Sequence, residues 1–190
     1  MQVDKVKVYG FKESVTASKY PKAVNVDECN ADMTDTVRNL GNADIGSGHD
    51  NFLNGIVVQF DLTCTVKMWV EAERYHFLDF VSSQSTMHRV TKFDPEIQCN
   101  EYVDPRNIDV LKEKIETYNA YPCHENLLAV LYNVPVGFRL TARMTTNYRQ
   151  LKTIYAQRKN HRLDEWKDFC KWIESLPYFK ELCLEGKKDD

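Results

Sequence analysis

The segment NYRQLKTIYAQRKNHR, residues 147–162, decides how the rest of this chain is interpreted. Leu140, Met144, Tyr148, Leu151 and Tyr155 recur every three or four residues, which predicts one long amphipathic helix over about residues 139–160. The surrounding stretch, residues 126–163, contains no Asp or Glu, although it carries several cations: Arg139, Arg143, Arg149, Lys152, Arg158, Lys159 and Arg162. A basic helix surface of this kind attracts anions, phosphate above all. We therefore expect a phosphate-bearing ligand, either a small nucleotide or a nucleic acid.

The overall composition argues against the nucleic acid. The chain has 190 residues, of which 43% are hydrophobic and 28% charged, with a formal net charge of −3. A protein that coats nucleic acid usually carries a basic excess over its whole domain. The basic stretch is thus a local feature of an ordinary folded protein, and nucleic acid is the less favoured ligand.

The cysteines and the hydropathy of the chain indicate in which cellular compartment the protein is expected. The chain has six cysteines without CxxC pairs or other metal-ligand spacing, so we expect free thiols and no metal site. The opening residues MQVDKVKVYG are charged and alternating, unlike a secretory signal, and no apolar run approaches the roughly 20 residues that span a bilayer. These features predict a cytoplasmic protein with no membrane association.

Periodicity predicts a single α+β domain over residues 1–190, with a small antiparallel sheet flanked by helices. Strands are expected at residues 3–9 and 56–65, where apolar and polar side chains alternate. Helices are expected at residues 67–85, 105–121, 125–132, 139–160 and 163–175. Residues 11–47 are interpreted as a helix followed by loops, residues 90–105 as loop, and the charged tail at 187–190 as frayed.

Three groups of residues could contact a phosphorylated ligand. Gly48 and His49 precede the second strand, where a histidine can donate to a phosphate. Residues 82–89 are rich in hydroxyls and end in Arg89, as an anion cradle would. Asn147 and Arg158 are eleven residues apart and would share a helix face, about 16 Å apart along the axis. The ordinary alternatives are a loop histidine, a solvated polar turn and a solvated basic helix.

Residues 147–162 resemble the C-terminal helix of the flavin-dependent thymidylate synthases (ThyX type), in which Asn-x-Arg-x-Leu is followed by a Leu-Arg pair and a His-containing turn. Pro135 falls where that family carries a Leu-Pro pair. Gly48 and His49, followed by Ile56 and Phe60, resemble the family's Gly-His segment and the strand after it. The order and the separations agree from about residue 48 to residue 162.

The resemblance implies a ThyX-like fold and a homotetramer that binds FAD and dUMP in sites shared between subunits. It implies transfer of a methylene group from methylenetetrahydrofolate to C5 of dUMP, with NADPH as the reductant of the flavin. By position it assigns flavin contacts to His49, Asn147, Arg149 and Arg162. Arg158 would hold the nucleotide, and we also assign Arg74, Ser85 and Arg89 to the substrate. No catalytic residue and no metal ligand is assigned.

The sequence departs from the family at several of these positions. The family's Arg-His-Arg-x-x-Ser-x-Asn-Glu-x-Ser-x-Arg motif falls best on residues 77–89, which keeps Ser82 and Arg89 but loses Arg-His-Arg. A shift of three residues places Arg74-Tyr75-His76 on Arg-His-Arg instead. An arginine expected before the proline is Leu131, and Thr153 and Gln157 replace an expected Asn and Leu.

These departures leave three hypotheses. The first is a divergent thymidylate synthase-like enzyme acting on a pyrimidine deoxynucleotide, and the second is a non-catalytic relative that binds a nucleotide or a partner protein. The third, a small nucleic-acid-binding protein, predicts a steep salt dependence of binding.

Overall fold

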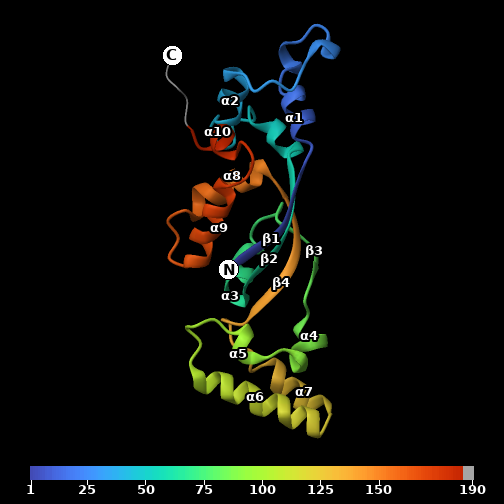
Figure 1. Cartoon of the computed structure of the whole chain (residues 1–190), viewed down its shortest axis with the longest axis vertical. Helices are drawn as coiled ribbons and strands as arrows, with labels where there is room; N and C mark the ends of the chain where they lie inside the picture. Colours follow the sequence, from blue (N-terminus) through green and yellow to red (C-terminus); the bar gives the residue numbers. More distant parts are fainter. Residues whose placement is uncertain (186–190) are drawn as a thin grey trace.

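The computed structural model describes residues 1–185, so the expected frayed tail at 187–190 lies outside the described residues. A four-stranded antiparallel sheet in the order β1–β2–β4–β3 runs through the centre of the molecule (Figure 1). Its strands are β1 (Gln2–Tyr9), β2 (Val57–Thr65), β3 (Asp79–Ser83) and β4 (Arg139–Asn147). The two central strands pair without interruption from Val57 opposite Asn147 to Thr65 opposite Arg139, whereas each edge strand has one shift in register.

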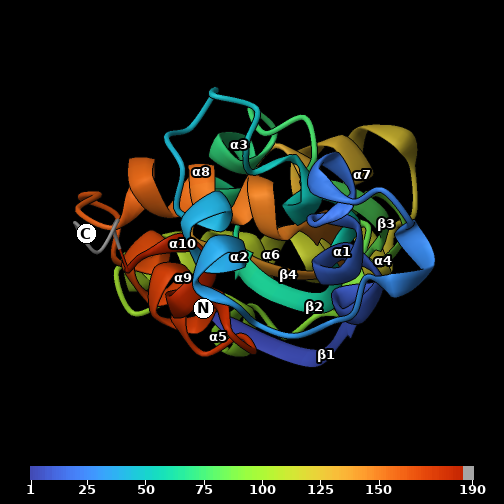
Figure 2. The same cartoon turned by 90° about the horizontal axis from the view of Figure 1, so that it is seen from above.

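Helices surround this sheet at both ends and along one side. They are α1 (Phe11–Ala17), α2 (Asp35–Gly41), α3 (Val66–Ala72), α4 (Thr86–Arg89), α5 (Pro95–Gln98), α6 (Pro105–Ala120), α7 (His124–Leu131), α8 (Tyr148–Arg158), α9 (Asp164–Glu174) and α10 (Phe179–Cys183), with short 3₁₀ turns η1 (Tyr20–Lys22), η2 (Val26–Glu28), η3 (Asn51–Gly55) and η4 (Val90–Lys92). Helices α8 and α9 lie beside the sheet, α6 and α7 beyond one end, and α1, α2 and α10 at the other (Figure 1). Seen from that second end, β1 forms an outer edge of the molecule (Figure 2).

The main core lies between one face of the sheet and α9. Phe60 and Met144, which pair across β2 and β4, are both fully buried. The ring of Phe60 lies 5.9 Å from that of Phe169 and 4.5 Å from that of Trp172, both in α9. Aromatic pairs at these separations add stability beyond the apolar area that they bury. This contact fixes α9, and with it the preceding helix α8, against the central strands.

A second, smaller cluster lies under the helical hairpin of α6 and α7. Its buried members are Val90, Cys99, Leu111, Ile115, Val130 and Phe138. Phe138, next to the start of β4, stacks edge-on against Phe93 at 5.7 Å. The hairpin therefore has its own apolar centre, which joins the sheet through the residues just before β4.

Several predicted elements are confirmed. The strands expected at 3–9 and 56–65 correspond to β1 and β2, and the helices expected at 105–121, 125–132 and 163–175 correspond to α6, α7 and α9. Helix α6 begins where Pro105 occupies the first turn and the Asp104 carboxylate accepts from the Arg106 backbone N–H at 2.9 Å. The expected α+β class with a small antiparallel sheet flanked by helices is confirmed as well.

The long basic helix predicted for residues 139–160 is wrong over its first half. Residues 139–147 form the central strand β4, and only Tyr148–Arg158 is helical. Leu140 and Met144 are four residues apart, a spacing that suits one face of a strand as well as one face of a helix. Thr141, Thr145 and Thr146 add β-branched side chains, which favour the strand. Pairing with β2 decides the matter by burying Ala142, Met144 and Thr146 on the core face.

The helix predicted for residues 67–85 is also too long. Helix α3 ends at Ala72, and residues 79–83 form the edge strand β3 along β4. The predicted loop at 90–105 contains the short turn η4 and helix α5. Residues 11–47 contain a second helix, α2, in addition to the expected first one.

Two further findings concern the covalent chemistry and the length of the helices. All six cysteines are free thiols, and Cys64, Cys99, Cys170 and Cys183 are buried. Among the residues described, no helix combines the length and the apolar character that crossing a bilayer requires.

Candidate functional site

The loop that carries His49 meets the start of α8, and this junction is the candidate site. Gly48 has a φ of +80°, a left-handed conformation that glycine adopts without strain. That turn leaves His49 exposed and directs Asp50, only 1% exposed, into the protein. The sequence thus places an accessible imidazole directly beside a buried carboxylate.

Asp50 connects this loop to α8 through two cations. Arg149 Nε donates to one carboxylate oxygen at 3.0 Å, and Lys152 Nζ donates to the other at 3.0 Å. Lys152 Nζ also donates to the backbone carbonyls of Gly41 and Ala43, at 2.8 and 2.5 Å. Because the three donors of the ammonium are all used, this lysine can be buried at little cost. The α2 end, the His49 loop and α8 are thereby held together.

A large cavity opens beside His49. Its volume is about 930 Å³, and its lining is mostly apolar, including Phe52, with the polar side chains of Lys19, Lys22 and His49 among the lining residues. A volume near the upper end of the range for ligand sites and a mostly apolar wall suit a large aromatic ligand. Lys19 and Lys22 form no ion pair within residues 1–185. Neither Arg149 nor its partner Asp50 lines this cavity, although Asp50 follows the lining residue His49 directly in the chain.

Asn147 ends β4 and caps α8. Its side-chain oxygen accepts from the backbone N–H of Gln150 at 2.8 Å, so the capping bond occupies that oxygen. The side-chain amide nitrogen keeps both of its donors available within the described part of the chain. Asn147 and Arg149 thus lie at the start of α8, where Asp50 joins the His49 loop to the helix.

Arg158, at the other end of α8, is enclosed by aromatic and acidic groups. Its Nε donates to the Tyr75 hydroxyl at 2.7 Å, and its Nη1 donates to Glu71 at 3.3 Å. The guanidinium carbon lies 4.8 Å from the centre of the Trp166 ring, a cation–π contact. The side chain is 12% exposed, so most of this cation serves the fold rather than a ligand.

Several groups stabilise the charged form of Glu71, the carboxylate that pairs with Arg158. Burial alone would raise the pKa of this carboxyl, but hydrogen bonds from Lys67 and Trp166 and the charges of Lys67 and His161 outweigh it and lower the pKa. Glu71 is therefore a carboxylate at neutral pH and pairs with both Arg158 and Lys67.

A second cavity, of about 370 Å³, lies along α8 between the two ends of the helix. It is lined by Arg74, Tyr75, His76, Phe77, Gln150, Thr153, Gln157 and Arg158. Two of the predicted substrate-binding residues, Arg74 and Arg158, are thus brought together. Thr153 and Gln157, which replace the family's Asn and Leu, also face this cavity. The Thr153 hydroxyl donates to the Arg149 carbonyl at 3.2 Å, and Gln157 accepts from Tyr75 at 3.0 Å.

The remaining predicted residues lie elsewhere in the chain. Ser85 occupies the N-cap position of α4 without making a capping bond, and Arg89 is exposed at the end of that short helix. Neither residue lines the two cavities described above. Arg162 lies beyond the last turn of α8, in a cavity whose wall includes Glu101, Asp164, Glu165 and Asp168. Within one chain, these three residues are separate from the junction at His49.

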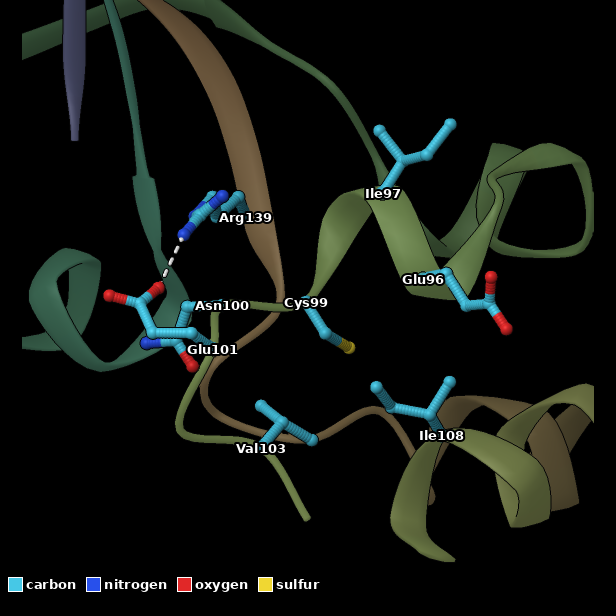
Figure 3. A pocket seen from close by; sticks show the side chains of 8 residues that line it. All are labelled: Glu96, Ile97, Cys99, Asn100, Glu101, Val103, Ile108 and Arg139. Atoms are coloured by element: carbon cyan, nitrogen blue, oxygen red, sulfur yellow. Dashed lines mark hydrogen bonds and ion pairs between the residues drawn. The ribbon is translucent and has the colours of Figure 1, made fainter. Parts of the chain in front are cut away.

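A further cavity, of about 490 Å³, lies where α5 meets β4, and it contains none of the predicted residues. Figure 3 shows Arg139 directed toward Glu101, with Ile97, Cys99 and Ile108 on the opposite wall. Arg139 Nη2 donates to Glu101 at 3.1 Å. Burial raises the pKa of the Cys99 thiol, so this cysteine is not an activated nucleophile.

The expectation that the acid-free stretch presents unpaired cations is wrong for most of them. Arg139 pairs with Glu101, Arg143 with Asp61, Arg149 and Lys152 with Asp50, and Arg158 with Glu71. Each carboxylate comes from a segment distant in sequence, which is why a local charge count does not find it. Sequence reasoning missed Asp50 and Glu71, and it named Lys152 only as one of the cations of the acid-free stretch. The only signal was the position of Asp50 directly after Gly48-His49.

Comparison with solved structures finds the same fold in another protein. The crystal structure of the flavin dependent thymidylate synthase ThyX from Helicobacter pylori, complexed with FAD and dUMP, matches with a TM-score of 0.74 and 16% identity, over 97% of this chain and 98% of that chain. A second structure of Helicobacter pylori ThyX with FAD and dUMP gives the same TM-score and identity, over 97% of each chain. No family model and no curated protein matches the sequence. At this identity the likeness shows a shared fold.

Proposed function

We propose that this protein is a divergent FAD-dependent thymidylate synthase-like enzyme that modifies C5 of a pyrimidine deoxynucleotide such as dUMP. The observation that carries the proposal is the junction of His49, Asn147 and Arg149 within a fold that matches ThyX over nearly the whole chain. These residues come from separate segments, and their convergence at one place supports a common ligand.

The residues at the junction fit a flavin dinucleotide. The cavity beside His49 is large and mostly apolar, which suits an aromatic ring system, and Lys19 and Lys22 at its wall suit phosphate groups. Arg149 contributes a guanidinium whose two terminal nitrogens have no hydrogen-bond partner within residues 1–185. When bound, FAD would supply hydride chemistry, while the protein supplies binding, orientation and charge.

The other parts of the proposal follow from the same family. Arg74 and Arg158 would face the nucleotide in the second cavity, with methylenetetrahydrofolate as the one-carbon donor and NADPH as the reductant. Ser85, Arg89 and Arg162 would complete the sites of neighbouring copies in a homotetramer, because within one chain they lie apart from the junction. The free thiols fit a reducing compartment such as the cytoplasm.

Flavin binding is the direct test. The purified protein should show flavin absorbance or take up added FAD, measured by quenching of flavin fluorescence. Arg149→Gln should weaken FAD binding roughly 10- to 100-fold, the equivalent of a lost hydrogen bond to a charged group. Arg106→Gln is the matched control, because Arg106 is exposed and pairs only with Asp104. A colourless protein that takes up no FAD contradicts the proposal.

One observation favours a second candidate function, a non-catalytic relative that binds a nucleotide. Arg158 is enclosed by Glu71, Tyr75 and Trp166, so it has little capacity left to hold a substrate phosphate. Thermal-shift measurements with dUMP and FAD separate the candidates. Stabilisation by dUMP without any response to FAD, together with no formation of thymidylate, would favour the binding protein.

A further inference from the structure

The charges around Asp50 do not balance, and the imbalance is built into the fold. Asp50 supplies one carboxylate, whereas Arg149 and Lys152 supply two cations, each 3.0 Å from one of its oxygens. The exposed fraction is 1% for Asp50, 7% for Lys152 and 31% for Arg149. The cluster therefore carries one net positive charge, and Arg149 is the member that meets solvent.

Within residues 1–185, no second carboxylate forms an ion pair with Arg149 or Lys152. Lys152 Nζ is otherwise bonded to the neutral carbonyls of Gly41 and Ala43. Cys183 lies nearby, but burial raises the pKa of its thiol, which keeps the thiol neutral. Arg149 uses only Nε for Asp50, so both terminal nitrogens remain unpartnered within residues 1–185.

We infer that Lys152 and Asp50 are positioning residues for a phosphate group: Asp50 fixes the Arg149 guanidinium, and Lys152 neutralises Asp50 so that Arg149 keeps its positive charge for the ligand. Without Lys152, the pair of Asp50 and Arg149 would be neutral and would attract no anion. With Lys152, the same carboxylate orients the arginine and leaves its charge available. A phosphate bound there would lie beside His49, on the loop that Lys152 holds.

The inference rests on the proposed function only for the identity of the ligand, and the charge count can be tested with inorganic pyrophosphate. Lys152→Met removes the net charge, Asp50→Asn raises it to two, and the double variant restores one. We expect Lys152→Met to weaken pyrophosphate binding on the order of tenfold in low-salt calorimetry. The double variant should bind more tightly than Lys152→Met alone.

A purely structural role predicts instead that pyrophosphate affinity follows the stability of the loop, because removing one partner of a buried ion pair destabilises a protein more than removing both. Urea denaturation is therefore measured for each variant, and affinities that follow the unfolding free energies at both low and high salt overturn the inference. A double variant that binds pyrophosphate no more tightly than Lys152→Met also overturns the inference. Lys171→Met is the control, since Lys171 is an exposed lysine paired with Asp168 on α9 and should leave binding unchanged. If Lys152→Met does not fold, Lys152→Gln removes the same charge while keeping a donor for the Gly41 and Ala43 carbonyls.

Titrations with FAD and dUMP separate this inference from the proposed function. If Lys152→Met binds pyrophosphate more weakly than the double variant does, and the protein does not bind FAD, the result supports the role of Lys152 and contradicts the flavoenzyme. FAD binding that is indifferent to Lys152→Met supports the flavoenzyme and contradicts the role of Lys152.

Discussion

At the scale of single residues, the fold assigns the cations of the acid-free stretch to two kinds of task. Arg158 pairs with Glu71 and packs against Trp166, which makes it part of the interface between α8 and α9. Arg149 shares its carboxylate with Lys152 and keeps unpartnered nitrogens within the described residues. Two arginines of the same helix thus differ in their surroundings: Arg158 is enclosed by Glu71, Tyr75 and Trp166, whereas Arg149 is 31% exposed.

Glu71→Gln should lower the free energy of unfolding by about 2 kcal/mol at pH 7, because it removes the charge from a hydrogen-bonded, largely buried carboxylate. The pKa of Glu71 is lower in the folded protein than its ordinary value of 4.5, so its stabilising effect is present above that value. The effect is lost as the pH falls through the folded pKa. Urea denaturation across a pH series measures the difference between the two proteins.

The difference between wild type and Glu71→Gln should therefore shrink below pH 4.5 and disappear once Glu71 is protonated in both states. Glu113→Gln serves as the control, because Glu113 is exposed and pairs only with the neighbouring Lys114. A difference that stays constant down to strongly acidic pH would show that the charge of Glu71 is not what stabilises the fold.

At the scale of elements, the junction between β4 and α8 sets the geometry of the candidate site. Asn147 is the last residue of the central strand and the cap of the helix, so one side chain couples the direction of both. The β2–β4 register places Asn147 opposite Val57, just after the turn that carries His49 and Asp50. This pairing brings the loop and the helix start together.

Asn147→Ala should lower the unfolding free energy by about 1 kcal/mol through loss of the cap. Asn147→Asp keeps an oxygen acceptor for the Gln150 N–H but lacks the amide donors, so it should retain stability. If Asn147 contacts flavin, Asn147→Asp should nevertheless weaken FAD binding. Thermal melting and FAD titration of both variants separate the two roles, and unchanged FAD affinity in Asn147→Asp would exclude the contact.

At the scale of the whole molecule, two apolar clusters divide the packing. The first joins the sheet to α8, α9 and the His49 loop, and the second lies beneath α6 and α7. The hairpin beyond the end of the sheet (Figure 1) is attached through η4, α5 and the segment before β4. The candidate site depends on the first cluster.

Leu111→Ala should test this division, because Leu111 is fully buried in the second cluster. The cavity left by the substitution should lower the free energy of local unfolding of α6 and α7 by about 2–5 kcal/mol. Hydrogen exchange should then accelerate in α6 and α7, while β2 and β4 stay protected. Hydrogen exchange read by mass spectrometry gives both results at once. Val110→Ala, at an exposed neighbouring position, is the matched control. Equal acceleration in β2 and β4 would mean that the clusters unfold as one unit.

The sequence by itself determined the elements whose signals are local. Alternation in residues 3–9 and 56–65 predicted β1 and β2, because a strand with one buried face needs that period whatever its partner. The helix expected at 105–121 corresponds to α6, because Pro105 in its first turn and Pro122 just after its end restrict the backbone wherever proline occurs. The α+β class also came from the sequence, whereas the association of His49 with residues 147–149 was a prediction from the resemblance to the ThyX family.

Only the tertiary structure decided which cations are compensated and where the last strand lies. The spacing of Leu140 and Met144 suits both a helix and a strand, and pairing with β2 selects the strand. Asp50 lies 102 residues from Lys152, and Glu71 lies 87 residues from Arg158. Charges so far apart in sequence neutralise each other only when folding brings them within a few ångströms, because solvent and salt screen them at longer range.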